Sequence, residues 1–331
     1  MAALARGAGM SLVDILSVLA ATIRLATPLV LATLGGLFSE RAGVVALGLE
    51  GMMLASAFAS ACIASISGSP WLALAAGMSI AMLLSLVHGF AAITQRGDQV
   101  VSGMALNILV AGLCPSLGLA WFHQGGQTPA LGHDMRFMPI TLPLADTLAG
   151  VPVLGPVWNN LIGGHNLIVY LAAVLLPASA WLLYRTSFGL RIRAVGENPH
   201  AVDAAGLSVA GLRYGALALS GLLVGLAGAD LSIAEGAGFG RDMTAGRGYV
   251  ALAALIFGKW RPVPAFGACL LFAFCDALQV RLQGVALPLV GVVPVQFVEA
   301  LPYLLTVLLL AGFVGAARAP RAIGLPFVKT R

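Results

Sequence analysis

Six acidic or amide side chains stand inside long apolar stretches, where they could take part in chemistry or contact a solute. They are Glu50, Asn107, Asp230, Glu235, Asp276 and Glu299. A charged or amide group is costly in an apolar environment, so each of them is a candidate for function; for Asp230 and Glu235, near the outer end of their stretch, the alternative is simple hydration. Glu50 is the leading candidate, because the nearby Gly48 and Gly51 permit close helix approach or local unwinding. We expect Glu50 to brace a broken helix against a neighbour's hydrogen-bond donors, with direct solute contact as the alternative. Asn107 could hydrogen-bond either a ligand or another helix.

The other patterns argue against an enzyme site. Asp276 lies five residues before Arg281, which predicts a structural ion pair. No carboxylate pair or Ser/His/Asp set has catalytic spacing, and the four cysteines lack the paired spacing of metal ligands. A phosphate-binding loop needs Gly-Lys followed by Ser or Thr, but the only Gly-Lys, Gly258-Lys259, precedes Trp260. The sequence therefore predicts no catalytic residue, no metal and no cofactor in this chain.

A polar interruption at 185–213 separates two apolar stretches and carries four arginines. Within it, Asn198 suits the N-cap of a helix, and Pro199 suits the first helical position, where its missing N–H costs nothing. Gly206 suits the left-handed residue just after a helix end. The pattern predicts a helix of about two turns at 199–205. Such a helix either docks a partner or belongs to an ordinary helical loop.

The composition places these features in a membrane protein. Hydrophobic residues make up 60% of the 331 residues and charged residues 9%, and the mean hydropathy is +0.97. Soluble domains carry roughly 25% charged residues, and a spanning helix needs about 20 apolar residues. Nine apolar stretches stand out, the seventh being short enough for a half-helix or re-entrant segment: 12–35, 43–66, 71–94, 98–121, 166–184, 213–235, 245–258, 264–283 and 298–316. We predict an all-α polytopic helical integral membrane protein, a single domain over 1–331, with eight or nine membrane segments.

Basic residues fall mainly on alternate loops, which predicts the orientation by the positive-inside rule. The 185–213 loop and the C-terminus are placed in the cytoplasm, and the 122–165 loop outside. The N-terminus is external if nine segments cross. The 122–165 loop is rich in proline and glycine, and it could hold a short helix over the external mouth or act as a passive cover. The net charge of +5 needs no nucleic-acid partner, since the basic residues sit mainly at membrane boundaries.

Three segments carry recognisable motifs: FGLRIRAVGENPHAVDAAGLSV within 185–213, GGLFSERAGVVALGLEGMMLASAF at 35–58, and GRGYVALAALIFGKWRP at 246–262. The first resembles the cytoplasmic coupling segment of permease subunits of bacterial ABC importers that handle branched-chain amino acids, simple sugars and nucleosides. The second is similar to the signature of the shorter permease in nucleoside-type importers, and the third to a late segment of the same family. One departure from the signature is Ala46, where relatives commonly carry asparagine.

The resemblance implies a transport subunit in the bacterial inner membrane that works by alternating access. It points to nucleosides, with purine nucleosides favoured, and then to simple sugars. It implies four kinds of contact: a second homologous permease, a cytoplasmic ATP-binding subunit that holds ATP and Mg, an extracytoplasmic substrate-binding protein, and the lipid bilayer. The resemblance also implies that coupling to the ATPase is carried by Gly189, Gly196, Glu197, Asn198, Pro199, Ala201 and Gly206. Glu50 and Asn107 are the expected residues of the translocation pathway.

Two other classes stay open. A self-sufficient secondary transporter of a small polar solute should show internal repeats and an ion site, and neither is evident in the sequence. A membrane-embedded enzyme should show a catalytic set, which is also not evident. A pathway poor in charge agrees with a neutral solute, because an ionic one would need a cluster of counter-ions.

Overall fold

The chain forms a bundle of long helices. A computed structural model describes residues 12–143, 151, 154–282, 286–287, 291–292, 300, 304 and 318–329. Seven described helices, two of them continuing into a short π-helix, are long and apolar enough to cross a membrane: α2 (Leu12–Arg41), α3 (Leu49–Ser67), α4 (Pro70–Gly89) with η1 (Phe90–Thr94), α5 (Gln99–Phe122), α8 (Leu167–Arg185), α11 (Val209–Asp230) with η4 (Leu231–Glu235), and α13 (Pro262–Leu282). The predicted all-α multi-pass membrane protein is confirmed.

Shorter elements connect these helices. They are the 3-10 helix η2 (His133–Met135), α7 (Leu154–Pro156), the π-helix η3 (Val157–Ile162), α9 (Ser187–Glu197), α10 (Pro199–Ala204), α12 (Arg247–Phe257), and the paired two-residue strands β1 (Ala286–Leu287) and β2 (Gly291–Val292). α12 has 11 residues and so extends for roughly half of a bilayer core at about 1.5 Å per residue. It corresponds to the short stretch 245–258. Most of the ninth stretch, 298–316, lies outside the described residues.

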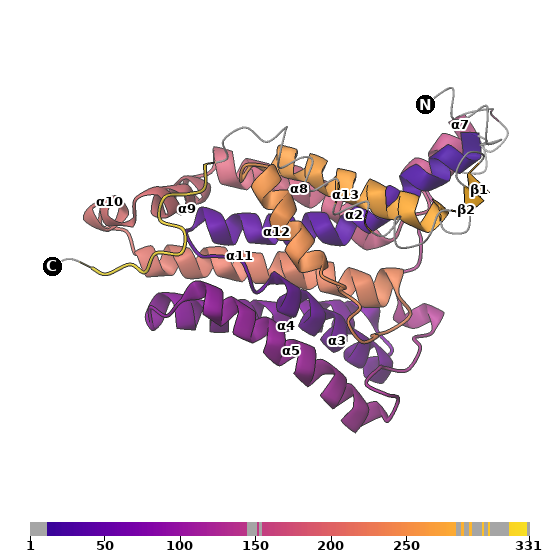
Figure 1. The fold of residues 1–331 in the computed structure, drawn as a ribbon, viewed down its shortest axis with the longest axis horizontal. Coiled ribbons are helices and arrows are strands. Elements are labelled where there is room, and N and C mark those ends of the chain that lie inside the picture. Colours follow the sequence, from indigo (N-terminus) through magenta and orange to yellow (C-terminus); the bar gives the residue numbers. More distant parts are fainter. Residues whose placement is uncertain are drawn as a thin grey trace.

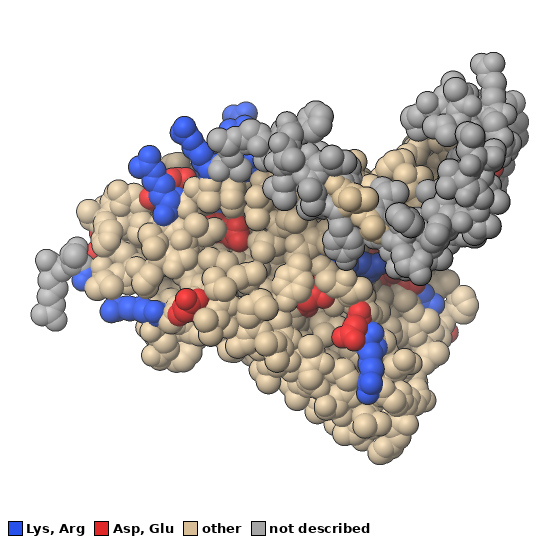
Figure 2. Space-filling view, in the orientation of Figure 1, with Lys and Arg blue, Asp and Glu red and all other residues tan. Residues whose placement is uncertain are grey.

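The long helices run along the longest axis of the molecule (Figure 1). One end carries α9, α10 and the C-terminal segment, and the opposite end carries α7, β1, β2 and the start of α2. Lysines and arginines are more frequent toward the α9–α10 end of the face in Figure 2. We call this the cytoplasmic end, following the positive-inside rule, and the opposite one the external end.

α11 and α3 form the centre of the bundle, whereas α4, α5 and α8 are mostly exposed along their apolar surface. Small residues bring α11 close to its neighbours. A Cβ on Gly221 would lie 2.5 Å from the Cα of Met82 in α4, and one on Gly228 would overlap the carbonyl oxygen of Met53 in α3. Glycine at such positions lets helix backbones approach closely, which compensates for the lack of a hydrophobic driving force between helices in lipid.

Two apolar stretches differ from their predicted bounds. α2 continues to Arg41, beyond the predicted end at residue 35, and the stretch 43–66 becomes helical only at Leu49. Residues 42–48 are not helical. Gly43 adopts a φ of +85°, and the Ser39 hydroxyl donates to the carbonyl oxygen of Val44 at 2.8 Å. An apolar run that is buried in protein need not be helical, because its backbone groups find partners other than lipid.

Candidate functional site: a helix junction and a cytoplasmic helix pair

Helices α3 and α12 both begin inside the bundle, and their N-termini meet there. Each follows a non-helical segment, 42–48 before α3 and 236–246 before α12. A Cβ on Gly248 would lie 2.5 Å from the backbone nitrogen of Glu50. The two backbones can therefore touch only because residue 248 is glycine. Helix N-termini carry unpaired N–H groups and a partial positive charge, so this meeting point needs an acceptor.

Glu50 supplies that acceptor. Its Oε1 accepts a hydrogen bond from the N–H of Gly246 at 2.9 Å, and its Oε2 accepts one from the N–H of Gly248 at 2.6 Å. α12 has no side-chain cap of its own, because its N-cap residue is Gly246. A carboxylate from α3 thus caps a helix that lies almost 200 residues later in the chain, and its negative charge is favourable at that helix end.

Asn107 joins α5 to the same place. Its Oδ1 accepts from the N–H of Gly51 at 2.8 Å, and its Nδ2 donates to the carbonyl oxygen of Leu47 at 2.8 Å and to the Tyr249 hydroxyl at 2.9 Å. The amide therefore holds the start of α3 and the first turn of α12 together. We call the cluster of Glu50, Gly51, Asn107, Gly246, Gly248 and Tyr249 the helix junction. The two pathway candidates from the sequence meet in it, with protein groups as their described partners.

The remaining acidic candidates have other described surroundings than the helix junction. Asp230 is fully buried, and its Oδ1 accepts from the Asn166 side chain at 3.3 Å. Glu235 lines a cavity at the external end, and Glu299 lies outside the described residues.

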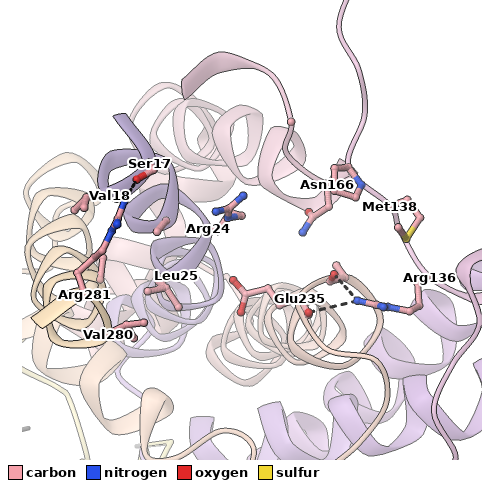
Figure 3. A pocket seen from close by; sticks show the side chains of 15 residues that line it. Ser17, Val18, Arg24, Leu25, Arg136, Met138, Asn166, Glu235, Val280 and Arg281 are labelled. Atoms are coloured by element: carbon pink, nitrogen blue, oxygen red, sulfur yellow. Dashed lines mark hydrogen bonds between the residues drawn. The ribbon is translucent and has the colours of Figure 1, made fainter. Parts of the chain in front are cut away.

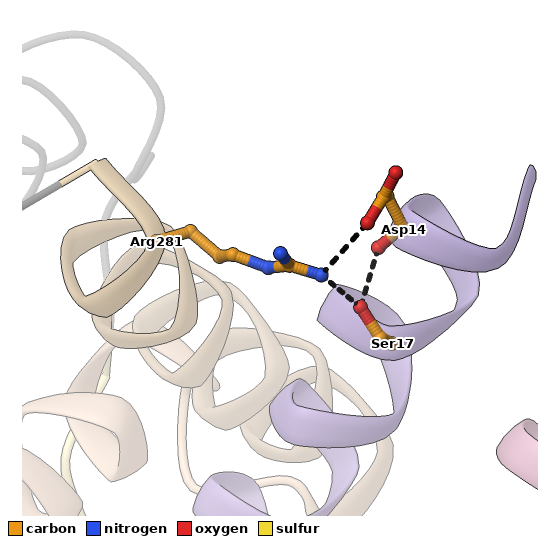
Figure 4. A network of polar contacts seen from close by, with 3 residues as sticks. All are labelled: Asp14, Ser17 and Arg281. Atoms are coloured by element: carbon orange, nitrogen blue, oxygen red, sulfur yellow. Dashed lines mark hydrogen bonds and ion pairs between the residues drawn. The ribbon is translucent and has the colours of Figure 1, made fainter. Parts of the chain in front are cut away.

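The predicted pairing of Asp276 with Arg281 is wrong. Arg281 instead forms an ion pair with Asp14 of α2 at 3.4 Å and also donates to Ser17 (Figure 4). Five residues of helix turn the two side chains of α13 about 140° apart, so Arg281 reaches the neighbouring helix instead of Asp276.

The cavity at the external end has a volume of about 680 Å³, within the range of about 300–1,000 Å³ typical of small-molecule sites. Arg24 of α2 and Glu235 of η4 extend into the same space, with Asn166 across from them (Figure 3). Arg136 donates to the backbone oxygens of Ala234 and Glu235, both at 3.4 Å. The walls therefore combine polar and charged groups with aliphatic side chains.

The 122–165 loop is tied down over this end. The N–H of Phe137 donates to the carbonyl oxygen of Ile233 at 2.8 Å, and the Phe137 ring packs edge-on against Trp71 of α4. Burial lowers the pKa of His165, which keeps the imidazole neutral beside the Leu161 carbonyl oxygen. Among the described residues of the loop, the helical elements are short: η2, α7 and η3.

The cytoplasmic interruption is helical almost throughout. Asn198 caps α10, its Oδ1 accepting from the N–H of Ala201 at 3.1 Å, and Pro199 is the first helical residue. Gly206 has a φ of +78°. The predicted helix at 199–205 is confirmed and ends at Ala204. A second helix, α9, was not predicted; the hydroxyl of Thr186 caps it by accepting from the N–H of Gly189 at 3.1 Å.

The seven coupling candidates divide into two groups. Gly189 and Gly196 are buried: a Cβ on Gly189 would overlap the Leu182 carbonyl oxygen, and one on Gly196 would overlap that of Arg41. These glycines let α9 rest against α8 and the end of α2. Pro199 is half-buried, and the other members are exposed on the surface: Glu197, Asn198, Ala201 and Gly206. The structure thus separates residues that support the helix pair from residues available to a partner.

Polar residues at the cytoplasmic end were not singled out from the sequence. Buried Glu40 accepts from the indole N–H of Trp260 at 2.5 Å, and the guanidinium of Arg41 donates to the Trp260 carbonyl oxygen. Arg213 is completely buried and donates to the carbonyl oxygens of Ala42 and Leu325. The available signal was that Glu40, Arg41 and Trp260 all fall within the recognised motifs at 35–58 and 246–262.

Comparisons with known proteins agree on the kind of molecule. The family model described as branched-chain amino acid transport system / permease component matches residues 18–317. The guanosine ABC transporter permease protein NupQ of Bacillus subtilis is 40% identical over 97% of this chain and 99% of its own length. The nucleoside ABC transporter permease protein NupC of Lactococcus lactis is 36% identical over 97% and 100%. A putative glucose ABC transporter permease of Haloferax volcanii is 37% identical over 88% and 89%. No solved structure gave a significant match.

Proposed function

We infer the function of this chain from one premise: it belongs to the family described as branched-chain amino acid transport system / permease component. We propose that it is the membrane-spanning permease subunit of an ATP-driven importer for nucleosides, with purine nucleosides favoured. The observation that carries the proposal is the identity of 40% with a guanosine permease and 36% with a nucleoside permease, both over nearly the full length of each chain. The multi-pass helical bundle agrees with a place in the bacterial inner membrane.

The proposal assigns ATP hydrolysis to a separate cytoplasmic subunit that holds ATP and Mg. This chain would work with that ATPase, a second homologous permease and an extracytoplasmic substrate-binding protein. α10 and the residues beside it would contact the ATPase, because they project from the cytoplasmic end and Glu197, Asn198, Ala201 and Gly206 are exposed there. Buried Gly189 and Gly196 would act indirectly, by seating α9 on the bundle.

The helix junction is the proposed moving part of the pathway. Two broken helices begin there, and the Glu50 carboxylate links them. Broken helices at membrane depth are tolerated where they line a cavity or are buried in protein. A shift of the 42–48 segment would move the start of α3 and, through Glu50, the start of α12. Such a shift would change the side of the membrane to which the pathway opens, as alternating access requires.

A sugar is the second candidate solute, because the putative glucose permease is 37% identical over most of this chain. The test is uptake of radiolabelled guanosine in cells that express the complete transporter and lack their own nucleoside uptake. Excess unlabelled adenosine should compete, and excess glucose should not. A matched strain whose ATPase partner cannot hydrolyse ATP should show no uptake. Uptake that persists there and follows an ion gradient would instead support a secondary transporter.

A further inference from the structure

The described C-terminal residues 318–329 form a cytoplasmic strap across the end of the bundle. In Figure 1 this segment runs along α9 and α10 as a chain without helices or strands. It contacts the neighbouring helices α9 and α10 and also the turn between α2 and α3, which lies much earlier in the chain. The strap therefore lies between the proposed ATPase contact and the segment that leads to the helix junction.

The outer part of the strap holds α10. The Phe327 ring lies 5.2 Å from the His200 ring, centroid to centroid. Phe327 also packs against a small apolar cluster formed by Val195, Val202 and Val209 of α9, α10 and α11. Lys329 forms an ion pair with Asp203 at 3.6 Å, but its side chain is 73% exposed and an exposed pair contributes little. The apolar packing is thus the stronger part of this contact.

The inner part of the strap holds the end of α9 and the α2–α3 turn through backbone hydrogen bonds. The N–H of buried Ala322 donates to the carbonyl oxygen of Gly196 at 2.8 Å. The N–H of Gly324 donates to the carbonyl oxygen of Gly43 at 3.2 Å. A Cβ on Gly43 would lie 3.0 Å from the Ala322 carbonyl oxygen, so strap and turn are in close contact.

Arg213 joins the same two segments from α11. Its Nε donates to the carbonyl oxygen of Ala42 and its Nη1 to that of Leu325, both at 3.2 Å. These two bonds satisfy part of the buried guanidinium, whose fixed fork suits two acceptors at once, while its Nη2 has no hydrogen-bond partner among the described residues. The Ala42 carbonyl lies just beyond the C-terminus of α2, where the helix dipole attracts a cation. Arg213 thus links the strap and the α2–α3 turn to the same position on α11.

We propose that the cytoplasmic strap and Arg213 transmit movement of α10 to the α2–α3 turn, and through residues 42–48 to the start of α3 at Glu50. This inference rests on the proposed function, because it takes α10 as the ATPase contact. The strap moves with α10 as one unit, because Phe327 packs against both His200 and Val202 and Lys329 pairs with Asp203. The backbone hydrogen bond from Gly324 to Gly43 carries that movement inward. The positioning residue in this device is Arg213, which contacts neither ATPase nor solute.

The main test is a chain that ends after Arg318, compared with full-length chain and with Val328→Ala, an exposed strap position. The complete transporter is reconstituted in vesicles with substrate-binding protein and guanosine. We expect the shortened chain to insert and to co-purify with the ATPase subunit. ATP hydrolysis should continue, while uptake falls by about tenfold, a typical size for coupling between distant sites. Val328→Ala should match full-length chain. Unchanged uptake, or loss of the ATPase subunit from the complex, would overturn the proposal.

Arg213→Lys provides a milder variant of the full-length chain. It keeps the positive charge but cannot bridge two carbonyl oxygens with a planar fork. The expected result is a lower ratio of guanosine imported to ATP hydrolysed, with normal abundance in the membrane. A ratio equal to that of the unaltered chain would contradict the role given to Arg213. If the unaltered complex imports no nucleoside at all, the proposed function itself is wrong, so the two failures are distinguishable.

If the shortened chain does not insert, a cross-link tests whether the strap and α10 move together. Asp203→Cys and Lys329→Cys are combined, because this ion pair contributes little to the contact, and a thiol-specific cross-linker is added; the four native cysteines are buried. Uptake should survive cross-linking, because strap and α10 move together. Uptake that stops on cross-linking, while the untreated double variant and both treated single variants still transport, would show that α10 moves against the strap. That result would overturn the proposal.

Discussion

The Glu50 carboxylate caps the helix that contains Gly248, and the missing side chain of Gly248 leaves the space for it. The Oε2 atom accepts from the N–H of Gly248 at 2.6 Å, and a Cβ on Gly248 would lie 2.6 Å from the Glu50 Cα. Glu50 supplies the hydrogen-bond acceptor. Gly248 supplies the donor N–H and, because it has no side chain, the space for the carboxylate. The junction between α3 and α12 therefore depends on a pair of residue types, and each can be tested separately.

Replacing Glu50 separates a structural brace from a direct role in transport. Glu50→Gln keeps one oxygen acceptor but loses the charge and one of the two N–H bonds. Glu50→Ala leaves the N–H groups of buried Gly248 and half-buried Gly246 without this acceptor, and a buried group left unpaired costs about 1–3 kcal/mol. If Glu50 is a brace, Gln should be largely tolerated and Ala should lower the amount of folded subunit. Membrane abundance and guanosine uptake are measured side by side for both variants.

Two other outcomes would revise this role for Glu50. Normal abundance with an altered apparent affinity in both variants would indicate solute contact. Normal abundance with no uptake in both would indicate that the charge is needed for the conformational change. Two variants that behave like the unaltered chain would exclude Glu50 from the pathway.

Gly248→Ala tests the space in the junction. The added methyl group would meet the Glu50 backbone, and overpacking of this kind costs about 1–3 kcal/mol. We expect a lower melting temperature in detergent and reduced uptake. Gly267→Ala in α13 is the matched control, because a Cβ there meets no atom within 4 Å. Equal melting temperatures for the two variants would show that α3 and α12 can separate without loss.

The sequence predicted the membrane segments because a helix of about twenty apolar residues matches the thickness of the bilayer core. It also pointed to Glu50 and Asn107, since a polar group among apolar residues needs a partner. It did not identify that partner: the N–H groups of Gly246 and Gly248 are almost 200 residues away. Composition likewise concealed the break at 42–48, because an apolar segment buried in protein has the same residues whether helical or not.

The cytoplasmic end shows the same division between local and distant information. Asn198, Pro199 and Gly206 act on their own backbone, so α10 was predictable to within one residue. The pairing of Arg281 with Asp14 depends on how α13 packs against α2. The sequence interval between Asp276 and Arg281 could not reveal that packing. The bonds of Arg213 to Ala42 and Leu325 join three distant segments, which no local pattern indicates.

Asn107 provides a test of how the junction is held together. Asn107→Leu keeps the volume but leaves the Gly51 N–H, the Leu47 carbonyl and the Tyr249 hydroxyl without this partner. Each buried group left unpaired costs about 1–3 kcal/mol, so the melting temperature should fall clearly. Tyr249→Phe removes one of the three bonds and should lower it less, because Tyr249 is 41% exposed and water can replace the bond. A larger effect for Tyr249→Phe than for Asn107→Leu would contradict this order.

Gly206 offers a test of the α10 contact that leaves the membrane bundle unchanged. Its φ is +78°, and a Cβ would meet no atom within 4 Å. Gly206→Val therefore introduces no clash, and its cost is the entry of a β-branched residue into the left-handed region, roughly 1–2 kcal/mol. We expect the variant to insert normally, while the end of α10 is distorted. Guanosine-stimulated ATP hydrolysis and uptake by the reconstituted complex should both fall.

Gly206→Asn is the matched control, because asparagine adopts the left-handed conformation more readily than valine. It adds a side chain of comparable size at the same exposed position and should retain most of the stimulated hydrolysis. If both variants lose activity equally, the surface at residue 206 is itself in contact with the ATPase and tolerates no side chain. If Gly206→Val shows normal stimulation, the shape of the α10 end does not matter for coupling, and α10 is an ordinary helical loop.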